Sequence, residues 1–84
     1  MNIVFTKSAW EDYLYWQNND KKTLKRINTL IKDIKRSTTE GIGKPEPLKF
    51  SLSGYWSRRI DEENRLVYKI EGNNIYLIQC RYHY

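Results

Sequence analysis

The sequence predicts an α+β fold in which two N-terminal helices pack on one face of a small twisted antiparallel sheet. Apolar residues recur at three- and four-residue spacing in the first half of the chain, and three strand-like runs separated by short polar turns fill the second half. Helices that precede such a meander are expected to cover its apolar face. The 84 residues leave room for one domain, which we place over residues 1–84.

The first half is expected to form a short strand and a helical hairpin. Residues 2–5 are the predicted opening strand, and Ser8 with Glu11 fits a capping box at the start of the first helix. Asp20 is the predicted N-cap of a second helix that ends at about residue 36. We expect the first helix to direct its large apolar side chains toward the core: Trp10, Tyr13, Leu14 and Trp16.

The second half is expected to form a loop and three strands. Residues 37–47 are rich in glycine, proline and small polar residues and are predicted to be a loop. The predicted strands cover residues 54–60, 65–70 and 75–84. Because the alternation of the last run continues to the chain end, we expect that end to be tied into the sheet.

The charge of +5 is concentrated in the second predicted helix. Residues 20–36 hold seven basic and two acidic side chains, so this segment alone accounts for the excess. Such a face is either an ordinary solvated surface or a stripe that contacts nucleic-acid phosphates, and composition does not separate the two. The residues expected to contact RNA in the second case are Lys21, Lys22 and Lys25.

Composition narrows the class of protein. Aromatic residues make up 14% of the chain, enough for a core, with one or two left over to stack on a nucleotide. Cys80 is the single cysteine and His83 the single histidine, so we expect a reducing, cytoplasmic location and neither metal ion nor cofactor. No apolar run approaches the roughly 20 residues of a membrane span, so no membrane association is expected.

One carboxylate and one imidazole are candidate acid–base groups. Glu46 lies between Pro45 and Pro47, which stiffen an extended backbone, and a general base needs such fixed placement. His83 can act as an acid or a base, and its neighbour Tyr84 can donate to a phosphate or stack on a base. A solvated loop glutamate and an idle terminal histidine are the alternative interpretations.

Several cations are candidates for binding phosphate. Arginine presents a planar fork that contacts two phosphate oxygens at once. Alternatively, the arginines pair with the acids of residues 61–63, and which of them share a sheet face depends on a register that the sequence leaves open. The candidates are Arg58, Arg59, Arg65 and Lys49. Together with Glu46 and His83 they suit cleavage of RNA by attack of a ribose 2′-OH on the adjacent phosphorus.

Five blocks of sequence resemble the YoeB toxins, which belong to the RelE/ParE toxin superfamily of type II toxin–antitoxin systems. The blocks are residues 10–16, 43–49, 52–60, 65–68 and the closing Cys-Arg-Tyr-His-Tyr of residues 80–84. The resemblance covers essentially the whole chain. It implies the RelE-like fold and a ribosome-dependent mRNA endoribonuclease that cuts message in the A site and inhibits translation.

The resemblance also assigns roles within this sequence. It implies that Glu46 is the general base, His83 the general acid and Arg65 the group that stabilises the transition-state phosphate. Lys49 and Arg59 would support Arg65, and Tyr84 would complete the site. The chain departs from the family pattern at Phe50-Ser51, where a polar His-Asn type pair is expected, and at Asn64, where histidine is common.

The resemblance further implies partners, and two other functions remain open. The expected partners are the ribosome, its mRNA and a YefM-like antitoxin, with operator DNA bound only through the antitoxin complex, and a homodimer is compatible with the family. One alternative is a ParE-like toxin that binds gyrase without cutting RNA, and another is a basic RNA-binding module. A gyrase binder has no need of the complete set of Glu46, Arg65, His83 and Tyr84.

Overall fold

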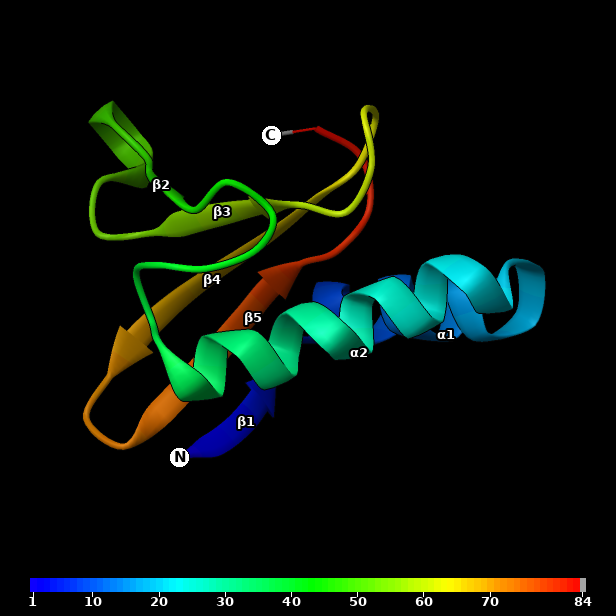
Figure 1. Ribbon diagram of the computed structural model, residues 1–84, viewed down its shortest axis with the longest axis horizontal. Helices are drawn as coiled ribbons and strands as arrows, with labels where there is room; N and C mark the ends of the chain where they lie inside the picture. The colour runs from blue at the N-terminus through cyan, green and yellow to red at the C-terminus, as the bar shows by residue number, and fades with distance from the viewer. Residues whose placement is uncertain (84) are drawn as a thin grey trace.

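A computed structural model describes residues 1–83 as two helices on a five-stranded sheet (Figure 1). The strand order is β1-β5-β4-β3-β2, with β1 parallel to β5 and every other pair antiparallel. The elements are β1 (Asn2–Phe5), α1 (Lys7–Asn19), α2 (Lys21–Arg36), β2 (Glu46–Pro47), the 3-10 turn η1 (Phe50–Leu52), β3 (Trp56–Arg59), β4 (Arg65–Glu71) and β5 (Asn74–Gln79). The predicted α+β class is confirmed. Neither helix is long and apolar enough to cross a membrane, as far as residues 1–83 are concerned.

The two helices are joined by one residue that serves both. The backbone N–H of Asp20 donates to Trp16 O at the end of α1, and its carboxylate accepts from the backbone N–H of Lys22 and Thr23 at the start of α2. The predicted cap at Asp20 is therefore confirmed. The predicted cap at Ser8 is wrong, because the extended Thr6 already accepts from the Ala9 N–H and starts α1 at Lys7.

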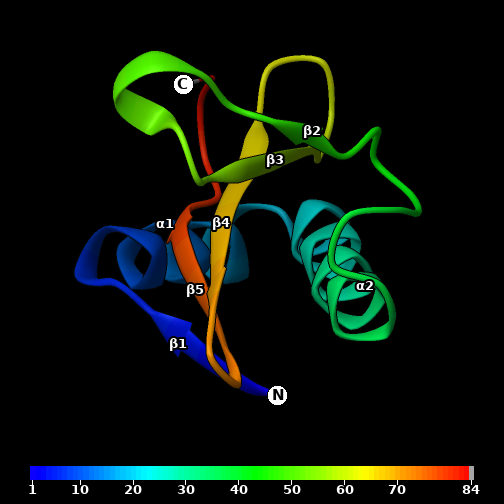
Figure 2. The same cartoon turned by 90° about the vertical axis from the view of Figure 1, so that its left-hand side faces the viewer.

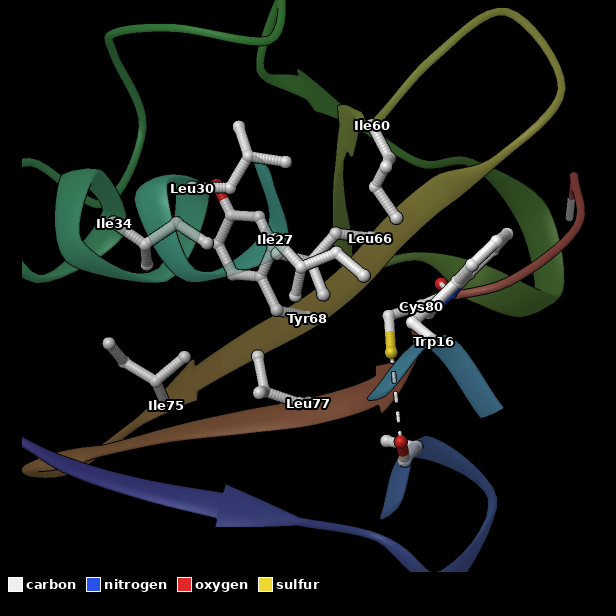
Figure 3. Close-up of a cluster of buried hydrophobic side chains, with 11 residues drawn as sticks. Trp16, Ile27, Leu30, Ile34, Ile60, Leu66, Tyr68, Ile75, Leu77 and Cys80 are labelled. Carbon is white, nitrogen blue, oxygen red and sulfur yellow. Dashed lines mark hydrogen bonds between the residues drawn. The ribbon is translucent and has the colours of Figure 1, made fainter. Parts of the chain in front are cut away.

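One core fills the space between the helices and the sheet (Figure 3). Ile27, Leu30 and Ile34 lie three and four residues apart on α2, and all three are fully buried. They pack against alternate residues of β4 and β5, among them Tyr68 and Leu77. The core thus lies on a single face of the sheet, and both helices contribute to it.

Trp10 does not join this core as predicted. Its side chain is 47% exposed, and its ring stacks on Tyr13 and meets the edge of Phe5 in β1. The reason is its position on the outer side of α1, whereas Trp16 on the inner side is buried.

The sheet differs from the prediction at both edges. β1 is parallel to β5 because the chain passes through both helices and the meander before β5 returns beside it. At the other edge, the last two residues of the predicted loop form β2, with Glu46 opposite Ser57 and Pro47 opposite Trp56. Proline is tolerated there because an edge strand has one side without a ladder partner.

The last strand ends at Gln79 rather than continuing to the chain end. The backbone N–H of Cys80 donates to the Asp12 carboxylate, and its carbonyl accepts from Trp16 Nε1. Side chains of α1 therefore make the hydrogen bonds to the Cys80 backbone that a neighbouring strand would otherwise make. Figures 1 and 2 both show the segment beyond β5 (red) running to the turn between β3 and β4 (yellow).

Candidate active site

A cavity of about 250 Å³ lies where the sheet edge, the loop before β2 and the C-terminal segment meet. It is lined by Lys44, Glu46, Ser57, Arg59, Arg65 and His83. Four of the predicted site residues are among them, namely Glu46, Arg59, Arg65 and His83. Segments separated by as many as 39 residues of chain thus present acid, base and cationic groups to one volume.

The strand register explains which side chains share this cavity. Glu46 lies opposite Ser57, and Arg59 lies opposite Arg65. Side chains alternate along a strand, so Ser57 and Arg59 point to the same face of β3. That face is turned away from α2. Two arginines directly across from each other repel, so the cavity favours an anionic ligand.

Arg58 points to the opposite face and is not part of the cavity. It is fully buried, with Nη1 bound to the Asp33 carboxylate and Nη2 donating to the carbonyls of Ser37 and Glu40 at 2.7 and 3.0 Å. Its Nε donates to the Tyr68 hydroxyl. The predicted contact of Arg58 with phosphate is therefore wrong, because its guanidinium is enclosed by protein and holds the loop after α2.

Asp33 is a structural residue that sequence reasoning missed. Its carboxylate accepts from the backbone N–H of Ile42 and binds Arg58 and Arg36. The Ile42 N–H lowers the pKa of Asp33 most, and the two arginines lower it further against the opposing effect of burial, so that it falls from 3.8 to about 2. In the sequence, Asp33 is one acid within a basic helix. Its role becomes evident only from its ion pair with Arg58 in the structure.

The loop that carries Glu46 is anchored on both sides. The backbone N–H of Arg59 donates to Gly43 O at 2.6 Å, and Leu48 N donates to Tyr55 O at 2.9 Å. Gly43 lies so close to the core that a Cβ there would come within 2.9 Å of Leu30 Cδ2. Glu46 is thus held between two fixed points, which agrees with the stiff mount expected from its flanking prolines.

Arg65 is oriented by the turn that precedes it. Its Nη1 donates to the carbonyls of Asp61, Glu62 and Asn64 at 2.6, 3.2 and 3.1 Å, and the residue is 8% exposed. The same turn is stapled by the Asp61 carboxylate, which accepts from the backbone N–H of Glu63 and Asn64. A guanidinium fixed in this way has little conformational freedom left to lose when it binds an anion.

The C-terminal segment is held at the same turn. Arg65 N donates to Tyr82 O at 2.9 Å, and Tyr82 N donates to the side chain of Asn64 at 2.6 Å. These bonds tie down the segment that carries His83, so the chain end is anchored by one backbone and one side-chain hydrogen bond rather than by a continued strand. Tyr84 lies outside the described residues.

A second hollow adjoins the cavity and contains Lys49. It measures about 450 Å³ and is lined by Glu46, Pro47, Leu48, Lys49, Phe50 and Leu52. Glu46 borders both spaces. Lys49 therefore lies beside the cavity rather than inside it, whereas Lys44, which sequence reasoning did not select, lines the cavity itself.

Backbone strain is concentrated around these two spaces. Three non-glycine residues within the described chain have positive φ: Lys44 at 50°, Phe50 at 57° and Tyr82 at 65°. This conformation costs roughly 1–2 kcal/mol per residue and is often retained at functional sites. Lys44 and Phe50 each border one of the hollows, and Tyr82 immediately precedes His83.

The three lysines predicted to contact RNA are exposed at the start of α2. Lys22 lines a shallow hollow together with Arg26, Ile60 and Asp61. Since the Asp61 carbonyl accepts from Arg65, this end of the basic helix lies next to the turn that supports the cavity. Among residues 1–83, no group of three histidine, cysteine or acidic side chains is placed to hold a metal ion.

The profile of the YoeB-like toxins of bacterial type II toxin–antitoxin systems matches residues 5–84. The chain belongs to this family. It is 62% identical over all 84 residues to Toxin YoeB of Synechocystis sp., covering 98% of that protein, and 55% identical to Toxin YoeB of Escherichia coli K12, covering all of it. It is therefore the toxin of a type II toxin–antitoxin system.

Solved structures of YoeB toxins share the fold over the whole chain. A YoeB/ParE toxin from Agrobacterium tumefaciens superposes with a TM-score of 0.98 at 49% identity, and the chains cover each other fully. A YoeB dimer from Staphylococcus aureus gives 0.94 at 55% identity, covering 98% of that chain. A heterotetrameric YoeB–YefM toxin–antitoxin complex from the same organism gives 0.93 at 55% identity, also covering 98%. The RelE-like toxin fold inferred from the sequence is thus confirmed.

Proposed function

We propose that this toxin is a ribosome-dependent endoribonuclease that cuts mRNA in the ribosomal A site and so inhibits translation. The observation that carries the proposal is the cavity that gathers Glu46, Arg59, Arg65 and His83 from four separate segments. One carboxylate, one imidazole and two guanidinium groups are the set that phosphodiester cleavage by a neighbouring 2′-OH requires.

In the proposed reaction, Glu46 removes the proton from the ribose 2′-OH. The oxygen attacks the adjacent phosphorus, the bond from phosphorus to the 5′ oxygen breaks, and protonated His83 gives its proton to that leaving oxygen. The products are a 2′,3′-cyclic phosphate and a 5′-OH end. Arg65 and Arg59 stabilise the charge on the non-bridging oxygens, and Tyr84 is assigned to complete the site.

The positions of two arginines on the sheet support the proposal on electrostatic grounds. Arg59 and Arg65 face each other across β3 and β4, an arrangement that is unfavourable until an anion lies between them. A phosphodiester supplies that anion. Lys44 adds a further cation at the cavity, and Lys49 adds one at its border.

We further propose that a YefM-like antitoxin is the partner of this toxin in the cytoplasm and that the toxin reaches operator DNA only through that complex. The YoeB–YefM complex and the YoeB dimer of Staphylococcus aureus support an antitoxin partner and a homodimer. The ribosome and its mRNA are the proposed target.

The test is to map message ends after adding the toxin to translating ribosomes. The wild type is expected to cut within the A-site codon, and Glu46→Gln to cut about 10²–10⁴ times more slowly, because the base is lost with little change of shape. Glu40→Gln, the same chemical change at an exposed residue of the same loop, is the matched control and is expected to cut normally. Normal cutting by Glu46→Gln would remove Glu46 from the mechanism, and intact message with the wild type would overturn the nuclease proposal.

A further inference from the structure

Among residues 1–83, Phe50 is the most exposed of the large apolar residues. Its side chain is 92% exposed, compared with 61% for Tyr82 and 47% for Trp10. Exposure of a phenyl ring is unfavourable in the isolated toxin, because its apolar area gains nothing from water. Phe50 also lines the 450 Å³ hollow, so a ligand bound in that hollow would cover the ring.

The backbone holds Phe50 in this position. Its φ of 57° lies in the left-handed region, which bulky side chains seldom adopt. The turn is closed by hydrogen bonds from Leu52 N to Lys49 O, from Ser53 N to Phe50 O and from Tyr55 N to Leu52 O. The ring is thus presented by a rigid turn, so that little conformational entropy is lost when a ligand covers it.

The surroundings of Phe50 indicate what that ligand is. The 450 Å³ hollow beside it has an apolar floor of Pro47, Leu48 and Leu52, while Lys49 supplies a cation and Glu46 is shared with the cavity. Because Glu46 borders both spaces, a strand bound in the cavity can place a neighbouring nucleotide in this hollow. An aromatic ring with a flanking cation is the arrangement that stacks on unpaired bases.

We propose that Phe50 and the adjoining hollow form a stacking subsite for the message base next to the cut. This inference rests on the proposed nuclease function, and it adds a residue to which the resemblance assigns no role. Stacking depends on an aromatic face and not on apolar area alone. Phe50→Trp is therefore expected to preserve the subsite, and Phe50→Leu to abolish it.

The first measurement is cleavage on translating ribosomes. Loss of stacking is expected to raise KM for Phe50→Leu about tenfold, with kcat largely retained, while Phe50→Trp stays within about twofold of the wild type. Trp10→Leu is the matched control, because Trp10 is also exposed but packs on β1 at the far edge of the sheet. Equal KM values for Phe50→Leu and the wild type would overturn the subsite and leave the nuclease proposal standing.

The second measurement does not depend on cleavage. Ribosomes carry a message with 2-aminopurine at successive positions of the A-site codon, and the Glu46→Gln variant is added. Quenching at one position is expected, and it should be lost when Phe50→Leu is combined with Glu46→Gln but not when Phe50→Trp is. This quenching pattern without any cutting by the wild type would uphold the subsite and refute the nuclease.

An antitoxin segment is the competing occupant of the hollow. Titration of each variant with the antitoxin separates the two, since loss of the phenyl ring weakens the occupant that packs against it. Unchanged quenching in Phe50→Leu together with weakened antitoxin binding would overturn the proposal and assign the hollow to the antitoxin. Unchanged antitoxin affinity with lost quenching supports the base-stacking role.

Discussion

Arg58 and Arg59 are neighbours on β3 but have different roles, although nothing in the sequence around them distinguishes the two. Arg59 points into the cavity, whereas Arg58 is enclosed on the helix side by Asp33, Tyr68 and the carbonyls of residues 37, 40 and 42. Removing one partner of a buried charge pair typically costs about 3–5 kcal/mol. The Arg58 contacts also fix the loop that leads to Glu46, so this arginine stabilises the site from the opposite face of the sheet.

Asp33→Asn is expected to alter how stability depends on pH. The pKa of Asp33 is lowered to about 2 in the folded protein, from 3.8, so its ionised form contributes stability that is present above pH 4 and lost as pH falls toward 2. The variant should be less stable at pH 7 and lose less stability on acidification. Urea unfolding between pH 2 and 7 measures this, with the exposed Glu62→Gln as control, and an unchanged acid slope would contradict the assignment.

Cys80 is expected to be inert toward thiol reagents in the folded protein. Burial, and to a lesser extent the nearby Asp12 carboxylate, raises the pKa of the Cys80 thiol to about 12. At pH 8 almost no thiolate is present, so labelling should require unfolding. The labelling rate in increasing urea is the measurement, with an unstructured peptide around Cys80 as reference. Labelling of the native protein at the peptide's rate would show that the site is open.

At the scale of elements, local patterns predicted the helices well. α2 follows from its apolar spacing and from Asp20, because both signals lie within a few residues of the helix they define. The sequence pattern does not identify Thr6 as the N-cap of α1, because Ser8 two residues later is an equally suitable capping residue. The end of β5 was missed because Asp12 and Trp16 are some 65 residues away in sequence.

The cavity was predictable in its residue types but not in its geometry. Glu46, Arg59, Arg65 and His83 were selected from their chemistry and from the resemblance. The exclusion of Arg58 follows from the pairing of Arg59 with Arg65, since shifting that register by one residue would exchange the two arginines. Lys44 lines the cavity in a backbone conformation with positive φ, and the sequence seldom predicts such a conformation for a residue other than glycine.

Helix α1 is expected to position the C-terminal segment for catalysis. Asp12 accepts from the Cys80 N–H, and the Arg81 guanidinium lies 3.4 Å from the centre of the Tyr15 ring. Asp12→Ala should lower kcat for ribosome-bound message with KM less affected, and should cost about 1 kcal/mol of stability. Asp12→Asn keeps an acceptor oxygen and should restore most of kcat. A merely structural role would leave kcat of the folded fraction unchanged in Asp12→Ala.

In the whole molecule, the basic helix α2 lies closer to the cavity than the sequence indicates. The basic excess lies on α2, but the start of that helix borders the turn that orients Arg65. The principal extents are only 31 × 26 × 24 Å, so cavity and basic helix can meet one large RNA surface together. Docking through α2 is then compatible with the proposed cutting at the cavity, in which the ribosome would supply and position the message.

Replacing Lys21, Lys22 and Lys25 by glutamine is expected to weaken ribosome binding without altering the cavity. Each lost phosphate contact lowers the slope of log affinity against log salt by about 1, so the triple variant should lose up to about 3. The control is the same triple change at three exposed lysines away from the start of α2, namely Lys7 on α1 and Lys32 and Lys35 near the end of α2, which removes equal charge. Cosedimentation with ribosomes over a salt series gives both slopes. Equal losses in the two variants would mean that binding does not depend on the start of α2, whereas a loss confined to the first triple would assign docking to the start of α2, beside the turn that holds Arg65.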